Sequence, residues 1–328
     1  MQRHSSLDDA ADLAAVAALL QIGAEIGVDQ LLDSGGTFSA ADLAKVADLP
    51  PAGVDDYLAA LVAAGLVVGA DSPNRFQVAE DYPDRRYAAG YVSWAMSANG
   101  PFLANARQFL TDRDAAARVH RRDGRRVAVS SRWIGERAFY PPIVDRVVSA
   151  GASHVADLGA GAGGLLIKLL GQDPARTGVA LDCSGAACAA AREAAVTAGV
   201  SDRLQVVERT VESLVDDPGP VEGTNAVLAC FVMHDIVADA AVAKAVLGAC
   251  RDALAPGGFM AVADAISYAS DPAERRFSAL FTYLHASFMS VTLPAEQQWL
   301  DAFQAAGFSR TDCVPLGVPG GRLFVAVK

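Results

Sequence analysis

The turn Asp157-Leu158-Gly159-Ala160-Gly161-Ala162-Gly163 constrains the fold of this chain more than any other segment. It follows the stretch His154–Asp157, which predicts a buried strand, and it precedes the stretch Leu165–Leu170, which predicts a helix. Because glycine has no Cβ, the backbone of such a turn can pass close beneath a bound ligand. A strand, a glycine-rich turn and a helix in this order are typical of proteins that bind a nucleotide at the edge of a parallel sheet.

Strands and helices alternate through the rest of the C-terminal half. We expect strands at 154–157, 178–182, 204–207, 226–231 and 259–263, helices at 165–170, 186–198 and 239–254, and an antiparallel terminal pair at 313–316 and 323–327. Asp239 is placed to cap the last of these helices. This alternation predicts an α/β fold with a Rossmann-like, doubly wound sheet that carries helices on both faces.

The N-terminal part has a different pattern. We expect a helix over 8–32, a helix that begins after Ser39 with Asp42 completing its cap, a helix over 51–64, and a hairpin from 66–68 and 75–78. Three helices followed by a hairpin are typical of a winged helix. We therefore predict a winged-helix dimerisation domain over 1–100, a helical connector that contributes to the substrate pocket over 101–148, and a cofactor-binding domain over 149–328.

The charges exclude a nucleic-acid reader as the main interpretation of the winged helix. Two basic residues against six acidic ones leave residues 37–80 with a charge of −4, and the whole chain has a formal net charge of −11. The helix that would read a base sequence begins after Pro51 and holds no Lys or Arg. Contacts to phosphates and base edges need such donors, so we expect no nucleic-acid partner.

Cysteine usage and hydropathy indicate the compartment. Five cysteines form no CxxC pair, which argues against a disulfide framework and a cysteine metal cluster and favours the reducing cytoplasm. Neither a signal peptide nor an apolar run of membrane-spanning length is expected, so we predict no membrane partner.

The glycine turn also bears on which nucleotide binds. Asp182 ends the second expected strand, 23 residues after Gly159, where a carboxylate can accept hydrogen bonds from ribose hydroxyls. NAD-binding domains usually carry GxGxxG, whereas this turn has glycines at every second position and begins with Asp157. That acidic start, together with the turn Pro256-Gly257-Gly258 before the fifth strand, resembles the class I S-adenosylmethionine-dependent methyltransferases. An NAD enzyme is the weaker alternative.

The resemblance extends along nearly the whole chain. The winged helix, the connector and the stretch Phe231-Val232-Met233-His234-Asp235-Ile236 look like the small-molecule O-methyltransferases of plants and actinobacteria. This resemblance implies a homodimer formed through the N-terminal domain, with Asp157, Gly159, Gly161, Gly163, Asp182 and Phe231 around the cofactor. The family usually ends its third strand with Gly-Asp, where this chain has Glu208-Arg209-Thr210, so Thr210 or Val211 is the candidate for the adenine contact.

His234 is the candidate general base. It lies just past the fourth expected strand, and ligands of doubly wound sheets bind beyond the carboxyl ends of the strands. In the O-methyltransferases the matching histidine removes the proton from a substrate hydroxyl, and an imidazole suits that task because its pKa lies near neutrality. A packed core histidine is the bland alternative.

A second histidine, His285, allows another interpretation. It lies in an apolar helix after the fifth strand, and the chain is similar to the bacterial 2-oxo acid C-methyltransferases of the phenylpyruvate and 4-methyl-2-oxovalerate types. The resemblance implies an iron or zinc ion held by His234 and His285, with Asp235 beside them and Phe277 as a pocket aromatic. Such a metal would stabilise the enolate of a 2-oxo acid before its β carbon (C3) is methylated, in natural-product biosynthesis such as that of antibiotics.

The remaining substrate contacts are expected from the helical part of the chain. An arginine would clamp the substrate carboxylate in a bidentate manner, and Arg118 and Arg132 are the candidates. Trp94 and Ser97 are further candidates in the aromatic stretch Tyr91–Ser97. We predict the metal-dependent C-methyltransferase, with a metal-free O-methyltransferase as the alternative. A winged-helix regulator that uses the fold as a ligand sensor is a third possibility, which the intact glycine turn disfavours.

Overall fold

The computed structural model describes residues 6–328; residues 1–5, with which the predicted N-terminal domain begins and which include His4, lie outside it. The chain forms two compact units, each made from two stretches of sequence. The first comprises Met1–Gln108 and Arg118–Arg137, and the second comprises Phe109–Ala117 and Ala138–Lys328. Residues 101–148, expected to form a connector, are therefore divided between the two units.

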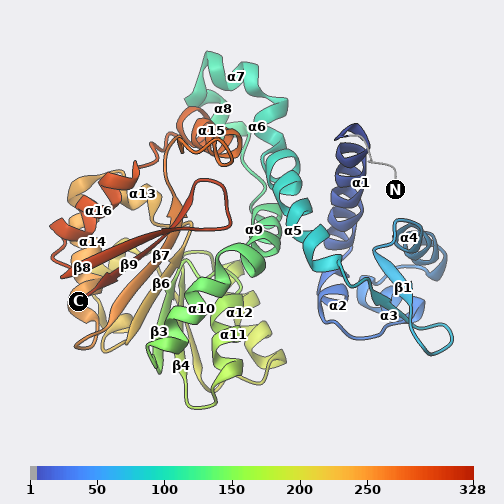
Figure 1. Ribbon diagram of the computed structural model, residues 1–328, viewed down its shortest axis with the longest axis horizontal. Helices are drawn as coiled ribbons and strands as arrows, with labels where there is room; N and C mark the ends of the chain where they lie inside the picture. Colours follow the sequence, from blue (N-terminus) through green and yellow to red (C-terminus); the bar gives the residue numbers. More distant parts are fainter. Residues whose placement is uncertain (1–5) are drawn as a thin grey trace. The chain divides into compact units, whose positions relative to one another are not determined.

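The second unit is built on a seven-stranded sheet. Its strands are β3 (His154–Leu158), β4 (Thr177–Asp182), β5 (Leu204–Glu208), β6 (Ala226–Cys230), β7 (Phe259–Ala265), β8 (Arg310–Pro315) and β9 (Gly321–Val327). They lie in the order β5-β4-β3-β6-β7-β9-β8 (Figure 1). Strand β9 runs in the direction opposite to the other six and is therefore antiparallel to both β7 and β8. The predicted Rossmann-like sheet is confirmed, including the antiparallel terminal pair.

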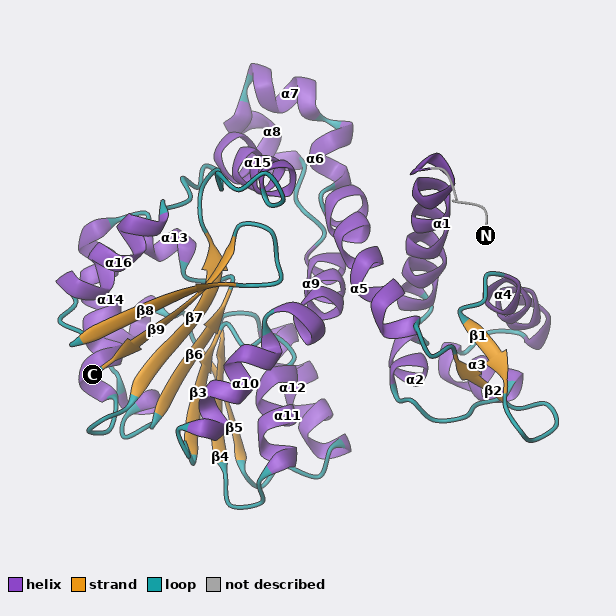
Figure 2. Ribbon diagram, viewed as in Figure 1, coloured by secondary structure: helices purple, strands orange, loops and turns teal. Residues whose placement is uncertain are grey.

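Helices cover both faces of this sheet (Figure 2). They are α10 (Tyr140–Ser149), α11 (Gly164–Gln172) and α12 (Gly185–Thr197) on one side, and α13 (His234–Val237), α14 (Ala240–Ala253) and α16 (Glu296–Ala305) on the other. Because both faces are covered, β7 is buried along its whole length. Asp239 caps α14 as predicted, since its side chain accepts hydrogen bonds from the amides of Ala241 and Val242 at 2.9 and 3.1 Å.

Short helices occupy the remaining connections of the second unit. Two 3₁₀ turns, η2 (Glu212–Val215) and η3 (Gly219–Val221), lie between β5 and β6, and α15 (Arg275–Leu284) with the π-helix η4 (His285–Met289) follows β7. Helices α7 (Ala106–Thr111) and α8 (Arg113–Val119) contribute residues to both units.

An aromatic stack fixes the end of β7. Trp299 and Phe303 on α16 are fully buried, and the ring of Trp299 stacks on Phe324 of β9 with centroids 5.0 Å apart. Trp299 also donates a hydrogen bond from Nε1 to the carbonyl of Ala265, the last residue of β7, at 3.2 Å. The ring stacking and this hydrogen bond join α16 to the carboxyl end of β7.

The first unit contains the predicted helices and hairpin, with one correction. Its elements are α1 (Ser6–Glu25), α2 (Asp29–Asp33), α3 (Ala40–Ala47), α4 (Pro51–Ala63), β1 (Val67–Gly69), β2 (Phe76–Val78), α5 (Tyr82–Val92), the π-helix η1 (Ser93–Ala98), α6 (Gly100–Ala104) and most of α9 (Gly124–Ala138). A single helix over 8–32 was wrong, because Gly27 adopts φ +79° and ends α1 before α2 begins. Ser39 and Asp42 form the predicted capping box.

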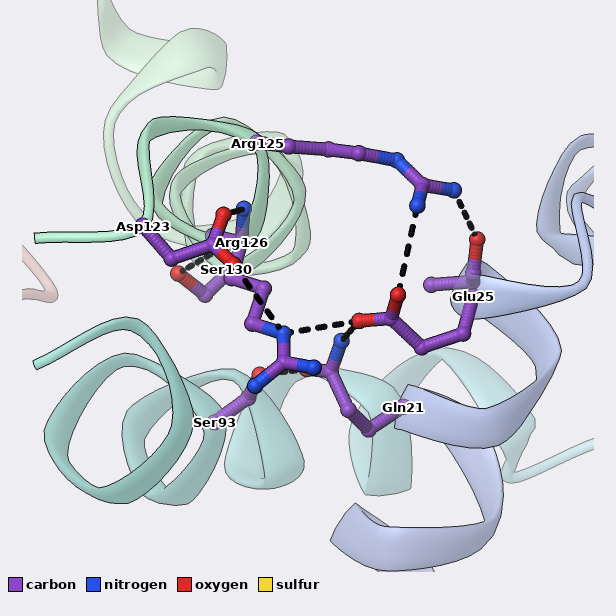
Figure 3. A network of polar contacts seen from close by, with 8 residues as sticks. Gln21, Glu25, Ser93, Asp123, Arg125, Arg126 and Ser130 are labelled. Atoms are coloured by element: carbon purple, nitrogen blue, oxygen red, sulfur yellow. Dashed lines mark hydrogen bonds and ion pairs between the residues drawn. The ribbon is translucent and has the colours of Figure 1, made fainter. Parts of the chain in front are cut away.

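Two arginines of the expected connector, Arg125 and Arg126, are paired inside the first unit. Figure 3 shows that Glu25 at the end of α1 forms ion pairs with Arg125 and Arg126 of α9. The nitrogen–oxygen distances are 3.2 and 2.8 Å. Gln21 donates to the same carboxylate at 2.9 Å and accepts a hydrogen bond from Ser93. These groups are partly exposed, so each ion pair contributes little to stability, about 0–1 kcal/mol. The network therefore joins α9 to α1 within the first unit.

None of the described helices combines the length and the apolar run that are needed to cross a membrane.

Candidate active site

The order of the strands reverses between β3 and β6, which are neighbours at the centre of the sheet. The connections that follow these two strands lead to opposite faces, and in such sheets ligands bind beyond the carboxyl ends of the strands at this point. The glycine turn follows β3, and the segment Phe231–His234 follows β6. The two motifs that the sequence analysis singled out therefore meet at one edge of the sheet.

The glycine turn has the backbone geometry that its sequence predicts. Gly159, Gly161 and Gly163 have φ angles of +69°, +55° and +74°, a region that other residues rarely adopt. A Cβ added to Gly159 would lie 2.8 Å from the side chain of Val232, whereas one added to Gly161 would meet no protein atom within 4 Å. Gly159 is thus required for packing between β3 and β6, and Gly161 faces open space.

Asp182 is tied to this turn. Its Oδ2 accepts a hydrogen bond from the amide of Gly161 at 2.9 Å, and its Oδ1 accepts one from the amide of Ser184 at 2.8 Å. A carboxylate has about four acceptor positions, so both oxygens keep capacity for a ligand. The contact holds the end of β4 against the turn and presents a charged acceptor beside Gly161.

Asp157 lies beneath the turn in a setting that disfavours a negative charge. Its side chain is 4% exposed, and burial together with the charge of Asp182 raises its pKa to about 8. Burial, with the nearby Asp157 and Asp264, also raises the pKa of the Cys230 thiol at the end of β6. This edge of the sheet is therefore acidic, and a positively charged ligand placed there would relieve the repulsion.

The adenine candidates differ in burial. Thr210 is exposed just beyond β5, whereas the side chain of Val211 is buried in the core of the second unit. Arg209 places this segment beside β4, because its amide donates to the carbonyl of Asp182 at 2.9 Å. Of the two predicted residues, only Thr210 presents its side chain outward.

Phe231 carries backbone strain at the centre of the site. Its φ is +54°, which is unusual for a bulky side chain, and its amide donates to the carbonyl of Ala263 at 2.8 Å. Strained residues persist where the surrounding structure holds them, and they cluster at functional sites. Phe231 directly follows β6 and stands three residues before His234.

His234 is held by a buried carboxylate that the sequence analysis missed. Its Nδ1 lies 2.7 Å from Oδ1 of Asp264, and Oδ2 of the same carboxylate accepts hydrogen bonds from the amides of Met233 and His234 at 3.0 and 3.1 Å. Because Asp264 accepts at Nδ1, the neutral ring carries its lone pair on Nε2. The signal in the sequence was that Asp264 is the only charged residue in the apolar strand β7.

His285 lies beside His234, from a different element. The two ring centroids are 5.1 Å apart and the rings are perpendicular. Nδ1 of His285 lies 2.7 Å from the carbonyl of Phe281, and its ring stacks on that of Phe281 with centroids 4.2 Å apart. A carbonyl only accepts, so the neutral ring of His285 also carries its lone pair on Nε2.

The third predicted ligand of a metal is less well placed. The side chain of Asp235 is 63% exposed, with Oδ1 at 3.5 Å from Nε2 of His234. Within residues 6–328, no three or more His, Cys, Asp and Glu side chains form a group that could hold a metal ion. The described residues therefore offer a histidine pair, and no complete set of protein ligands.

Aromatic side chains surround the two histidines. Phe281 is central: its ring centroid lies 6.1 Å from Phe231, 6.3 Å from Phe277 and 6.4 Å from His234. Phe139 packs on Phe231 at 5.0 Å. Phe277, a predicted pocket residue, belongs to this group, and Phe281 is a member that the sequence analysis did not single out. An organic acceptor in contact with these rings would be hydrophobic or aromatic.

The other predicted substrate residues belong to the first unit. Trp94 is buried and Ser97 is half-buried on η1, and Arg118 is exposed near the end of α8. Arg132 is ion-paired with Asp29 and, at 3.3 Å, with Asp33. The existing partners of Arg132 give it a structural role in the first unit, and contact of these four residues with a substrate stays a prediction.

Comparison with known proteins agrees with this geometry. Residues 156–260 match the family model of a methyltransferase domain. The chain is 28% identical over 179 residues to 3-hydroxy-5-methyl-1-naphthoate 3-O-methyltransferase of Streptomyces sahachiroi, a match that covers 54% of this chain and 49% of that protein. It is 38% identical over 128 residues to 2,7-dihydroxy-5-methyl-1-naphthoate 7-O-methyltransferase of Streptomyces carzinostaticus, covering 39% and 36%.

A relative with another activity matches as well. The chain is 31% identical over 156 residues to aclacinomycin 10-hydroxylase RdmB of Streptomyces purpurascens, which covers 48% of this chain and 40% of that protein. All three matches thus span half or less of the relatives' length.

Among solved structures, the fold is similar along the whole chain to N,N-8-amino-8-demethyl-D-riboflavin dimethyltransferase (RosA) of Streptomyces davawensis, with a TM-score of 0.57, 19% identity and 99% coverage of both chains. The glycine turn, the acidic strand ends and the family match agree with one another. Residues 156–260 of this chain therefore match a methyltransferase domain, within a fold that resembles that of the solved methyltransferase.

Proposed function

We propose that this protein is an S-adenosylmethionine-dependent O-methyltransferase that acts on a hydroxyl group of a hydrophobic, aromatic small molecule, with His234 as the general base. The observation that carries the proposal is the buried pair of His234 and Asp264, 2.7 Å apart, at the carboxyl ends of β6 and β7. Two of the curated relatives are named as O-methyltransferases of hydroxylated naphthoates, which supports a phenolic acceptor.

The residues at the strand ends fit S-adenosylmethionine. Asp182 is a charged acceptor suited to ribose hydroxyls, and the open space at Gly161 leaves room for the nucleoside. The buried Asp157 favours a positive charge nearby, and the cofactor carries both an ammonium and a sulfonium group. When bound, the cofactor supplies an electrophilic methyl group on its sulfonium sulfur.

The chain's own residues prepare the nucleophile. Nε2 of His234 carries the lone pair, so it can accept the proton of an acceptor hydroxyl and leave a more nucleophilic oxygen. The ring then becomes an imidazolium, which Asp264 stabilises through Nδ1 and Asp235 through its position 3.5 Å from Nε2. The aromatic group around Phe281 would orient the acceptor and exclude water.

A product assay tests this proposal. The purified protein is incubated with the cofactor and a panel of hydroxynaphthoates, and the reaction is followed by release of S-adenosylhomocysteine and by mass spectrometry of the acceptor. We expect an oxygen-bound methyl group, formed equally well after treatment with a chelator. No methylated product from any acceptor, or an acceptor that has gained an oxygen atom, would overturn the proposal.

One observation favours a second candidate function, C-methylation of a hydrophobic 2-oxo acid with the help of a metal ion. The neighbouring rings of His234 and His285, each with Nδ1 hydrogen-bonded and a lone pair on Nε2, are arranged as a pair of metal ligands often is. In this case His234 and His285 would hold iron or zinc, and the ion would supply a Lewis acid for the 2-oxo group of the substrate.

Metal analysis and one variant separate the two functions. For an O-methyltransferase we expect no stoichiometric metal and substantial activity in His285→Ala. For a metal-dependent C-methyltransferase we expect about one metal ion per chain, loss of the ion in His285→Ala, and a carbon-bound methyl group in the product. In that second case, Arg118→Met with an unchanged KM for the 2-oxo acid would exclude Arg118 as the carboxylate clamp.

A further inference from the structure

Two buried hydroxyl groups on α15 have no role in the chemistry described so far. Ser278 is 2% exposed and Thr282 is 4% exposed, and both lie on the helix that leads into His285. Buried polar groups are retained where they are hydrogen-bonded, and each of these two accepts a hydrogen bond from a backbone amide. Their partners lie in the loop that continues from β7, the strand that carries Asp264.

The hydroxyls fasten α15 to that loop at two consecutive amides. Oγ1 of Thr282 accepts a hydrogen bond from the amide of Tyr268 at 3.1 Å and donates to the carbonyl of Ser278 at 2.8 Å. Oγ of Ser278 accepts a hydrogen bond from the amide of Ala269 at 2.9 Å. One turn of helix separates the two side chains, so the two contacts fix the position of α15 along its axis and its rotation about that axis.

The loop itself is held in a strained form that makes these contacts possible. Tyr268 adopts φ +44°, a conformation that costs an aromatic residue of the order of 1–2 kcal/mol, and its side chain is 62% exposed. Because the side chain of Tyr268 is exposed, its burial does not offset this strain. The hydrogen bond from the amide of Tyr268 to Thr282 is the contact that accompanies the strained conformation. Gly320 closes the arrangement from the other side, because a Cβ there would lie 2.9 Å from Ser278.

The consequence concerns His285. It lies three residues after Thr282, and it is held to Phe281 through both its Nδ1 and its ring face. A small shift of α15 would therefore move the His285 ring relative to the His234 ring. His234 would not follow, because Asp264 on β7 holds it separately. The positions of both histidines thus depend on β7. His234 is held by the carboxylate of Asp264 on that strand, and His285 is held through the loop that follows the strand.

We propose that Thr282 and Ser278 are positioning residues, which set the place of His285 against His234 by fastening α15 to the loop after β7. Only the expected effect on turnover rests on the proposed function, because the placement of one ring against the other can be measured without turnover.

The test compares isosteric and conservative variants. Thr282→Val removes the hydroxyl at nearly constant volume, and Thr282→Ser retains it. Thr224→Val is the matched control, because Thr224 is also a fully buried threonine, whose Oγ1 donates to the carbonyl of Val221 at 2.9 Å just before the amino end of β6, away from the site. Each variant is labelled with isotopes in histidine, and the ring signals are assigned with His234→Gln and His285→Gln.

We expect both Thr282→Val and Thr224→Val to lower the melting temperature, and Thr282→Val to lower it further, because Thr282 loses two hydrogen bonds and Thr224 loses one. Only Thr282→Val should displace or broaden the ring signals of His234 and His285, and Thr282→Ser should restore them. Ser278→Ala, which loses a single contact, should displace the signals less and serves if Thr282→Val does not fold. Ring signals of both histidines at their original positions in Thr282→Val and Ser278→Ala would overturn the proposal.

Turnover gives a second, separable result. If His285→Ala abolishes turnover, as the metal-dependent function requires, kcat in Thr282→Val should fall roughly 10- to 100-fold, because a misplacement of about 1 Å can cost a hundredfold, and Thr282→Ser should recover it. If His285→Ala keeps substantial activity, as expected of the O-methyltransferase, kcat in Thr282→Val should stay close to that of the wild type. An unchanged kcat in Thr282→Val of an enzyme that His285→Ala inactivates would count against the proposal. Displaced ring signals in a protein that methylates nothing would instead refute the proposed function and leave the positioning role intact.

Discussion

Asp264 stands one residue beyond Ala263, the partner of Cys230 in the β6–β7 ladder, and from there it reaches across to Nδ1 of His234 at 2.7 Å. Its carboxylate also accepts hydrogen bonds from three amides, those of Met233, His234 and Ala265. Because every oxygen is engaged and the residue is fully buried, the imidazole is held in one orientation and one tautomer.

Replacing Asp264 by Asn should abolish most turnover and leave cofactor binding intact. The amide can donate to Nδ1 and so favour the tautomer in which Nε2 bears the proton and cannot act as a base. General base catalysis contributes about 100- to 10,000-fold, so kcat should fall within that range. Steady-state kinetics measures the loss, and calorimetry with S-adenosylhomocysteine serves as the control. A variant with nearly full kcat would exclude His234 as the base.

Two glycines of the turn should respond differently to the same substitution. Gly159→Ala should destabilise the fold, because its Cβ would lie 2.8 Å from Val232 in addition to the strain of φ +69°. Gly161→Ala meets no protein atom within 4 Å, so it should cost only the backbone strain, about 1–2 kcal/mol, while obstructing the cofactor.

Thermal unfolding and calorimetry check this pair together. The melting temperature should fall further in Gly159→Ala, and the affinity for S-adenosylmethionine should fall by a larger factor in Gly161→Ala than the loss of stability explains. Equal affinities of wild type and Gly161→Ala would place the nucleoside elsewhere.

The sequence was informative where local chemistry dictates structure. The glycine turn, the Asp239 cap and the Ser39 capping box each depend on a few neighbouring residues, and the structure has all three. The central sheet was equally predictable, because its strands are apolar runs between helices. The break between α1 and α2 was missed because Gly27 sits inside an otherwise helical pattern of apolar residues.

Features that join distant segments were harder to predict. Asp264 and His234 are 30 residues apart and meet only because β6 and β7 are adjacent. The neighbourhood of His234 and His285 was expected from a resemblance, whereas the contacts that hold His285, to Phe281 and through Thr282 to Tyr268, have no signature in the order of residues. Arg132 was chosen for its charge, and its partners Asp29 and Asp33 come from a helix about a hundred residues earlier in the chain.

The buried Asp157 should make the stability of the cofactor-free protein depend on pH. Its pKa is about 8 in the folded protein against an ordinary value of 3.8, so the folded state holds a proton that the unfolded state has released. Stability should therefore fall as the pH rises from about 4 to about 8, by up to about 1.4 kcal/mol per pH unit from this group alone. Above that range its contribution is constant.

Asp157→Asn isolates this contribution. Urea unfolding of both proteins across the same pH range should show the variant gaining stability relative to wild type as the pH rises, with the largest gain at about pH 8 and above. Parallel curves for the two proteins would mean that Asp157 releases its proton without cost. The variant should also bind the cationic cofactor more weakly, and S-adenosylhomocysteine, which lacks the sulfonium charge, should lose less affinity.

Cysteine alkylation offers a test of the cofactor site that needs no acceptor. Cys183 is exposed and directly follows Asp182, the expected ribose ligand, whereas Cys188 and Cys250 are buried. Cys313 is half-buried on β8, and burial raises its pKa to about 11, which keeps its thiol unreactive near neutral pH.

Iodoacetamide should therefore modify Cys183 first, and bound S-adenosylhomocysteine should slow that reaction several-fold while leaving the slow reaction of Cys313 unchanged. Peptide mass spectrometry over a time course measures both rates in one sample, with Cys183→Ser to identify the peptide. Because the protection depends on the nucleoside lying beside Asp182, an unaltered rate at Cys183 with saturating cofactor would place the nucleoside away from the end of β4.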